Sequence, residues 1–263
     1  GFSMTSFRSK RLEGLGMSEI RTMTKECNRV GGINMGQGIC DMPTPPLVRD
    51  GAIQAIKDRQ SRYSYTEGTV KLREAIAKKA KRDNGIEADP SSEILVTVGA
   101  SGAYSCTLWG LLNPGDGIIL FEPYYGYHLN CAIGAGLEPQ FVTLKPPEFT
   151  ITEEAIRAAA KSNTRAIVVC TPSNPSGKMF TVEELELIGR LAEELDLLVI
   201  SDEIYEYIRF DDRPHVSPRT IRSIRDRSVT IMGLSKTFSI TGWRLGYAIA
   251  RPEFIQAMTL VND

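Results

Sequence analysis

Short apolar runs rich in β-branched residues recur through the last two thirds of the 263-residue chain, and most are separated by longer segments with apolar residues at helical spacing. The short runs predict seven strands, at Ile94–Val98, Gly117–Phe121, Pro139–Val142, Ala166–Cys170, Leu197–Ile200, Ser228–Met232 and Gly246–Ala250. The longer segments predict four helices, at Ala103–Leu112, Tyr127–Ala135, Thr152–Ala160 and Val182–Leu195. Apolar strands that alternate with helices favour an α/β fold, a mostly parallel seven-stranded sheet with helices on both faces.

The starts of two of these helices carry polar signals. Thr181 followed by Glu184 is a capping-box pattern, in which each residue's side chain bonds the other's backbone N–H. Thr152 precedes Glu153 and Glu154, so that two acids fall in a first helical turn. Both patterns support the predicted helix boundaries.

The first 90 residues show few strand signals. Helical spacing predicts helices at Leu47–Lys57 and Val70–Ala80, and near them lie a Gly- and Pro-rich segment, Gly31–Pro46, and a tyrosine-bearing turn, Tyr63–Gly68. We therefore expect an N-terminal arm and substrate-loop segment over residues 1–45 and one large ligand-binding domain over residues 46–263.

Composition narrows the function classes. The chain has 31 Lys and Arg against 32 Asp and Glu, is 42% hydrophobic, and contains no long basic run of the kind that nucleic-acid binding requires. No apolar stretch approaches the ~20 residues that span a bilayer, so no membrane association is predicted. The cysteines form no C-x-x-C pair and the two histidines are far apart, so we expect no disulfide framework, no metal site and a reducing, cytoplasmic compartment.

Residues just after parallel strands gather at one edge of a sheet, where ligands bind. After the first predicted strand, Gly99–Gly102 opens a helix whose free N–H groups can hold a phosphate. A tight strand-to-helix turn that needs glycine explains the same residues equally simply. After the fourth strand, Asn174 can present its amide to a ligand, or it forms an ordinary Asn-Pro turn.

Two further loops at this edge carry charge. Asp202 follows an apolar run and needs a cationic or N–H partner there, although a helix N-cap would also explain it. Lys236 is flanked by apolar and hydroxyl residues, which favours a nucleophilic amine over a solvated surface lysine. Arg244 supplies a planar cation suited to phosphate. Together with Tyr205, these groups fit an aldehyde cofactor that has a phosphate and a pyridine ring.

The segment Ser235–Gly246, SKTFSITGWRLG, matches the lysine signature S-K-x-F-x-x-x-G-x-R-x-G. In this string, and in the order of the Asn-Pro and Asp-x-x-Tyr elements, the chain resembles the pyridoxal-phosphate-dependent aminotransferases of fold type I, class I/II, from about Arg21 to its end. The resemblance implies the large domain of that fold and transfer of the amino group of an L-amino acid to a 2-oxo acid.

The resemblance also implies roles for single residues. Lys236 would hold pyridoxal 5′-phosphate as a Schiff base and then move the proton at the substrate Cα. Asp202 would pair with the pyridine N–H and keep the ring an electron acceptor. Tyr205 and Asn174 would bond the ring 3′-oxygen, and Tyr125 would stack on the ring.

By the same resemblance two groups of residues would bind the phosphate. Ala100 and Ser101 would do so at the start of a helix, in a cofactor-binding loop that includes Gly102. Ser235 and Arg244 would do so near the lysine. Gly38, in a Gly-Gln-Gly form that leans toward the kynurenine and glutamine type, would lie against the substrate carboxylate. Tyr63 would reach the phosphate of a neighbouring subunit, which implies a homodimer.

The chain departs from the family pattern in two places. Cys40 and Met42 stand where the family more often has Pro and Phe, a change that bears on substrate preference. Family members also continue past a position like Asp263 into a C-terminal small domain with the arginine for the substrate carboxylate, and this chain offers no residue for that role.

Three alternatives therefore stay open. The first is a β-eliminating lyase or synthase of the same fold, which uses the same residues. The second is a non-catalytic regulatory domain that binds the cofactor. The third is a chain that binds the cofactor without turnover.

Overall fold

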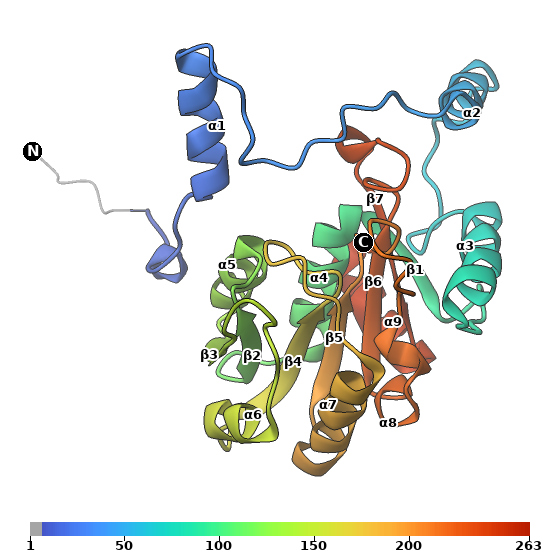
Figure 1. The fold of residues 1–263 in the computed structure, drawn as a ribbon. Coiled ribbons are helices and arrows are strands. Elements are labelled where there is room, and N and C mark those ends of the chain that lie inside the picture. The colour runs from blue at the N-terminus through green and yellow to red at the C-terminus, as the bar shows by residue number, and fades with distance from the viewer. Residues whose placement is uncertain (1–6) are drawn as a thin grey trace, which may run out of the picture.

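A computed structural model describes residues 7–263, and its centre is one seven-stranded sheet (Figure 1). The strands are β1 (Ile94–Val98), β2 (Gly117–Glu122), β3 (Glu138–Thr143), β4 (Thr164–Cys170), β5 (Leu198–Asp202), β6 (Ser228–Gly233) and β7 (Leu245–Ala250). Their order in the sheet is β1-β7-β6-β5-β4-β2-β3. Every neighbouring pair is parallel except those made by β7, which runs antiparallel to both β1 and β6. The prediction of a mostly parallel seven-stranded sheet is confirmed.

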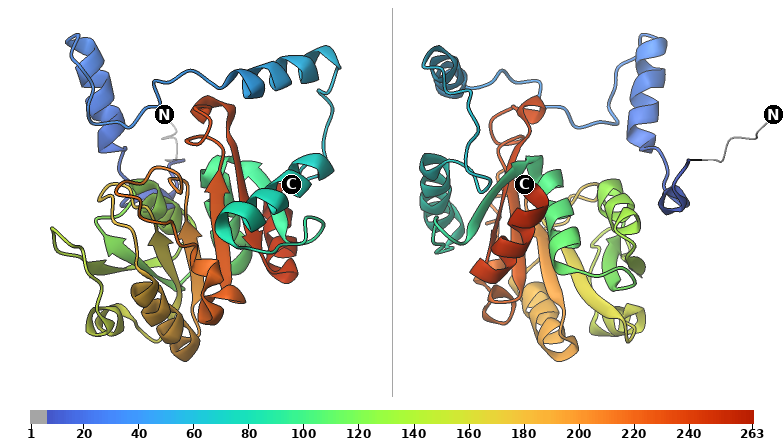
Figure 2. Two further views of the ribbon diagram at one scale, coloured as in Figure 1. Left: turned by 45° about the vertical axis from the view of Figure 1, so that its right-hand side comes forward. Right: turned by 180° about the vertical axis from the view of Figure 1, so that it is seen from behind.

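Helices cover both faces of this sheet (Figure 2). They are α3 (Val70–Asn84), α4 (Gly99–Leu111), α5 (Gly126–Gly134), α6 (Glu153–Ala159), α7 (Val182–Leu195), α8 (Arg222–Arg225) and α9 (Pro252–Asn262). Alternation along β2 shows how the two faces are separated: Ile118 and Leu120 pack in one buried cluster, and Ile119 packs in another. Successive residues of β2 point to opposite faces, and both faces are covered by helices. The strand is therefore apolar at nearly every position.

The predicted caps form as expected. The Thr181 side chain accepts the backbone N–H of Glu184, and the Glu184 side chain accepts that of Thr181, which completes the capping box at α7. Thr152 caps α6. Helix α4 begins at Gly99, four residues before the predicted start, because the small residues Gly99–Gly102 are its first turn.

The N-terminal segment lies apart from the sheet (Figures 1 and 2). It carries a short 3-10 helix (Lys10–Leu12), then α1 (Glu19–Arg29), which the sequence analysis did not predict, and α2 (Pro46–Lys57). Neither α1 nor α2 has a buried residue. Residues 1–6 of the expected arm lie outside the described residues, and the division at residue 45 stays a prediction.

The reversed strand β7 brings its own start to the ligand-binding edge. The chain leaves the carboxyl end of β6 at Gly233 and enters β7 at Leu245, after a connection with one short 3-10 helix, Thr241–Trp243. An antiparallel return needs no helical crossover. Lys236 and Arg244 both lie on this connection, so the fold keeps them at the same edge.

The Asp83 carboxylate joins the end of α3 to Tyr207, in the segment that follows β5. Asp83 accepts a hydrogen bond from Arg82 Nε at 2.6 Å and another from the Tyr207 hydroxyl. These bonds hold the pKa of Asp83 at about 2, below its usual 3.8, and the bond from Arg82 has the larger effect.

Asp83→Asn should therefore lower the free energy of unfolding at neutral pH and flatten its dependence on acid. A carboxyl whose pKa is depressed by folding stabilises the protein above its unfolded pKa, and that increment is lost as the pH falls from about 4 to about 2. Urea unfolding at stepped pH values measures both effects. Glu148→Gln, at an exposed carboxyl, is the control. Equal acid sensitivity of Asp83→Asn and the parent protein would contradict the assignment.

Candidate active site

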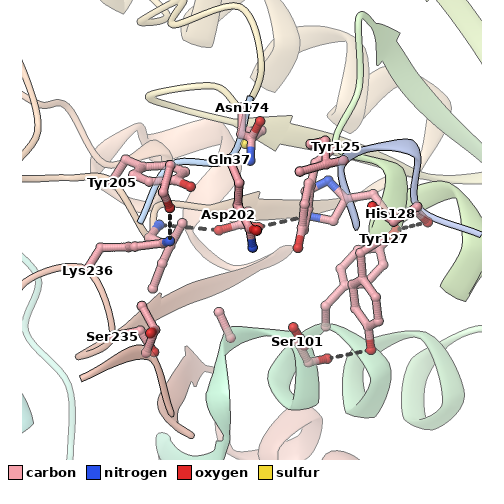
Figure 3. A pocket seen from close by; sticks show the side chains of 18 of the residues that line it. Gln37, Ser101, Tyr125, Tyr127, His128, Asn174, Asp202, Tyr205, Ser235 and Lys236 are labelled. Atoms are coloured by element: carbon pink, nitrogen blue, oxygen red, sulfur yellow. Dashed lines mark hydrogen bonds and ion pairs between the residues drawn. The ribbon is translucent and has the colours of Figure 1, made fainter. Parts of the chain in front are cut away.

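A cavity of about 490 Å³ opens at the carboxyl edge of the sheet (Figure 3). The predicted site residues that line it come from the arm, α4, the strand ends and the β6–β7 connection: Gly38, Ala100, Ser101, Tyr125, Asn174, Asp202, Tyr205, Ser235, Lys236 and Arg244. Two predicted residues do not line it. Gly102 lies within α4, and Tyr63 is fully exposed, so its contact with a neighbouring subunit stays a prediction.

Lys236 points its amine into this cavity. Its Nζ donates a hydrogen bond to the Gly38 carbonyl oxygen at 3.3 Å and lies 5.7 Å from the centre of the Tyr205 ring (Figure 3). Neither contact is an ion pair with a carboxylate. An amine beside an aromatic ring and a carbonyl is placed to act as a nucleophile once deprotonated.

Asp202 ends β5 as a buried carboxylate, and its main partner is a histidine (Figure 3). The Nε2 atom of His128, on α5, lies 2.8 Å from Oδ2, and Oδ1 accepts the backbone N–H of Ile204 at 3.2 Å. Because an ionised carboxylate only accepts, His128 Nε2 must carry the hydrogen. No helix begins at Asp202, so the N-cap alternative is wrong and the carboxylate faces the cavity.

Burial keeps three titratable groups of the cavity neutral, namely the Tyr125 and Tyr205 hydroxyls and the Cys170 thiol. It is the largest cause that raises the pKa of the Tyr125 and Tyr205 hydroxyls, with the nearby Asp202 charge adding to it. Burial and Asp202 also raise the pKa of the Cys170 thiol. Both tyrosines are therefore hydrogen-bond donors at neutral pH, and Cys170 stays a thiol rather than a nucleophilic thiolate.

The far end of the cavity is built to take an anion. The Arg244 guanidinium lies against Gly99, the first residue of α4, where a Cβ would approach its Nη2 to 2.4 Å. A cation at the positive end of a helix is electrostatically unfavourable unless an anion joins both. Among the described residues Arg244 has no carboxylate partner; it donates to the Thr241 carbonyl at 2.8 Å. A phosphate placed here would be bound by the guanidinium and by the helix N–H groups.

Pyridoxal phosphate fits this arrangement of groups. An amine for its aldehyde, a buried carboxylate for its ring nitrogen and a cradle for its phosphate lie around one cavity large enough for a small ligand. Aromatic side chains at Tyr125 and Tyr205 supply faces and hydroxyls for the ring. The residues present therefore suit the cofactor that the sequence implied.

Several lining residues were missed by the sequence analysis. They are Ser18, Ile20, Arg21, Gly36, Gln37, Tyr104, Tyr127, His128, Cys170, Ile204 and Thr241. The signal for Gln37 was present, because it lies between Gly36 and Gly38 in the quoted loop. His128 gave no such signal, since its contact with Asp202 depends on how α5 packs against α4, β2 and β3.

The described part of the chain holds no group of three or more His, Cys, Asp or Glu side chains arranged for a metal ion. Over residues 7–263 none of the helices is both long enough and apolar enough to pass through a bilayer.

Fold and cavity together define the large domain of a fold type I protein. Residues 30–263 match the family described as aminotransferase class I and II, and the chain belongs to this family, whose members depend on pyridoxal phosphate. Among curated relatives, the chain is 36% identical to an aspartate aminotransferase of Pyrococcus abyssi over 95% of its own length. It is 35% identical to aromatic-amino-acid aminotransferase 2 of Thermococcus litoralis over 94% of its length.

A solved structure agrees with this assignment. The N-succinyldiaminopimelate aminotransferase of Mycobacterium tuberculosis superposes with a TM-score of 0.94 at 33% identity, over 97% of this chain and 67% of that one. The chain spans 65% of the length of the Pyrococcus relative and 64% of the Thermococcus relative.

Proposed function

We propose that this chain is the cofactor-binding part of an aminotransferase that moves the amino group of an L-amino acid to a 2-oxo acid. One observation carries the proposal: the Lys236 amine faces the same cavity as the buried Asp202–His128 pair and the anion cradle at Arg244. The names of the related proteins, all aminotransferases, support it.

Bound pyridoxal phosphate supplies an aldehyde that condenses with amines and a ring that accepts electrons from the Cα of an amino acid. The Asp202 carboxylate would hold a proton at the ring nitrogen, and His128, at 2.8 Å from Asp202 Oδ2, orients that carboxylate. Lys236 Nζ would take the proton from the substrate Cα and deliver it to the carbon that carried the aldehyde of the cofactor. Tyr205 and Asn174, which line the cavity, would donate hydrogen bonds to the ring 3′-oxygen, and Tyr125 would cover a ring face.

The phosphate is bound, in this proposal, by Ser101, Ser235, Arg244 and the N–H groups of Ala100 and Gly102 at the start of α4. Gly38 borders the place of the substrate carboxylate, since its carbonyl oxygen already contacts Lys236. The substrate is an amino acid, and the chain's departures at Cys40 and Met42 lie close to where its side chain is expected.

We further propose a homodimer in the cytoplasm. Large apolar side chains of the N-terminal segment are exposed, at Ile33, Met35, Leu47, Ile56 and Tyr63 among others. Exposed apolar residues concentrated on one segment favour an interface. In such a dimer Tyr63 contacts the cofactor phosphate of the other subunit. The free thiols of all five cysteines agree with a reducing compartment.

A single-turnover reaction tests the proposed activity. Protein loaded with pyridoxal phosphate is mixed with aspartate or glutamine and, in a separate reaction, with serine, whose β-hydroxyl can leave, and the products are separated. We expect a 2-oxo acid and pyridoxamine phosphate in equal amounts. Pyruvate with free ammonia and no pyridoxamine phosphate would instead show the β-eliminating alternative. Cofactor binding with no product from any amino acid would favour the regulatory or non-catalytic alternatives.

A further inference from the structure

We propose that Glu203 and Glu206 are positioning residues: two buried carboxylates that hold the turn bearing Asp202 and Tyr205 against the cofactor. The proposal rests on the proposed function, because it assigns a role toward the same cofactor.

The segment from Asp202 to Glu206 divides its side chains between two environments. Asp202 and Tyr205 line the cavity. Glu203 and Glu206 do not, and they are only 0% and 4% exposed. A carboxylate removed from water in this way costs several kcal/mol unless donors compensate it. Two such residues, each next to a cavity residue, therefore need an explanation.

Glu203 is anchored to the segment that follows the turn. Its Oε1 lies 2.7 Å from His215 Nε2, and its Oε2 accepts the hydroxyls of Ser201 at 2.7 Å and Ser217 at 3.2 Å. The His215 side chain is itself 7% exposed, and its Nδ1 has no partner among the described residues. The bond to Glu203 is thus the one polar contact of this ring, which fixes residues 215–217 to the end of β5.

Glu206 is anchored on a different element. Its Oε1 accepts Lys79 Nζ at 2.5 Å and Asn84 Nδ2 at 3.1 Å, both from α3. Lys79 also donates to the Asn84 Oδ1 at 2.9 Å, and its amine lies 3.3 Å from the Tyr247 hydroxyl of β7. This cluster ties the turn to α3 and to the reversed strand.

The turn itself has little internal structure to hold it. Its backbone bonds run from Glu206 N to Glu203 O at 3.0 Å and from Ile208 N to Tyr205 O at 2.8 Å, and no regular helix follows. Buried ion pairs add little net stability compared with apolar packing, but they favour one geometry over others. Anchors from two elements therefore set the direction of Asp202 and Tyr205, which is the precision that a cofactor site needs.

A double-mutant cycle on the cofactor-loaded chain tests this role. The Kd for pyridoxal phosphate and the visible absorption band of the complex are measured for Glu203→Gln, first with the natural site and then in the background Asp202→Asn/Tyr205→Phe. Glutamine keeps the shape of the side chain and removes its charge. Glu93→Gln is the matched control. Glu93 is a partly buried glutamate paired with Arg219, and it precedes β1 at the end of that strand away from the cavity.

We expect Glu203→Gln to raise the Kd about tenfold and to alter the band in the natural site, and to change the Kd less than about twofold in the doubly substituted background. Glu93→Gln should leave Kd and band unchanged in both. Glu206→Gln, examined in the same way, should behave as Glu203→Gln does. Where Glu203→Gln fails to fold, Ser217→Ala removes a single donor and takes its place in the cycle.

An equal effect of Glu203→Gln in both backgrounds, or no effect in either, would overturn the positioning role, because the carboxylate would then act on stability alone or not at all. A natural chain that binds no pyridoxal phosphate would be a different result: it would overturn the proposed function and this role with it.

Discussion

Lys236→Ala should remove the visible absorption band that pyridoxal phosphate gives when it is bound to this chain. This Schiff-base band lies at a longer wavelength than the absorption of the free aldehyde and requires a covalent bond between the cofactor and an amine, and Lys236 is the lysine that lines the described cavity. The phosphate cradle at Arg244 and the start of α4 is untouched by the substitution. We therefore expect the variant to bind the cofactor noncovalently, with a Kd at least about tenfold higher.

Absorption spectra after dialysis measure the first effect, and borohydride reduction followed by mass spectrometry locates the modified residue. Lys161→Ala, at an exposed lysine near the opposite edge of the sheet, should keep both band and affinity. A band in Lys236→Ala that survives dialysis would mean that another amine carries the cofactor, and the assigned site would be wrong.

Gly246→Ala should destabilise the chain and damage the anion cradle together. A Cβ at this position would lie 2.3 Å from the carbonyl carbon of Gly99 and 2.4 Å from the backbone nitrogen of Ala100. Both are backbone atoms and cannot rotate away, so β7 and the start of α4 must separate. We expect a loss of about 1–3 kcal/mol in the free energy of unfolding, as for overpacked cores, together with weaker cofactor binding.

Urea unfolding and titration with inorganic phosphate measure the two consequences separately. Gly51→Ala is the matched control, because it lies inside α2 with no atom within 4 Å of the added methyl group. Alanine there should be neutral or stabilise by up to about 1 kcal/mol through helix propensity. Unchanged stability of Gly246→Ala would contradict the close packing of β7 on α4.

Much of the fold could be predicted because its strands are apolar and its helices periodic. Every predicted strand is present, most with ends within one or two residues, and the capping box at Thr181 marked the start of α7 to the residue. Strand order and direction were harder. The reversal of β7 is encoded only in the short connection from Gly233 to Leu245, which leaves no room for a crossover helix. Helix α1 was missed although Ile20, Met23 and Cys27 recur at helical spacing, and none of its residues is buried.

The predicted site residues converge in one cavity because parallel strands deliver their carboxyl ends to one edge. What the sequence could not provide was the packing behind them. His128 reaches Asp202 across 74 residues of chain, and Glu203 reaches His215 through a segment without regular structure. Such contacts depend on how helices and loops settle on the sheet, which neither motif spacing nor periodicity specifies.

The reversed strand also dictates when this domain can finish folding. Edge strand β1 pairs with β7 alone, so Ile94 must wait for Ile249, near the end of the described chain. Contacts between residues so far apart in sequence form slowly. Strand β1, which is synthesised first, stays unpaired until β7 is available. During synthesis β1 and the first turn of α4 therefore stay undocked until β7 has left the ribosome. Cofactor capture then has to follow the synthesis of β7.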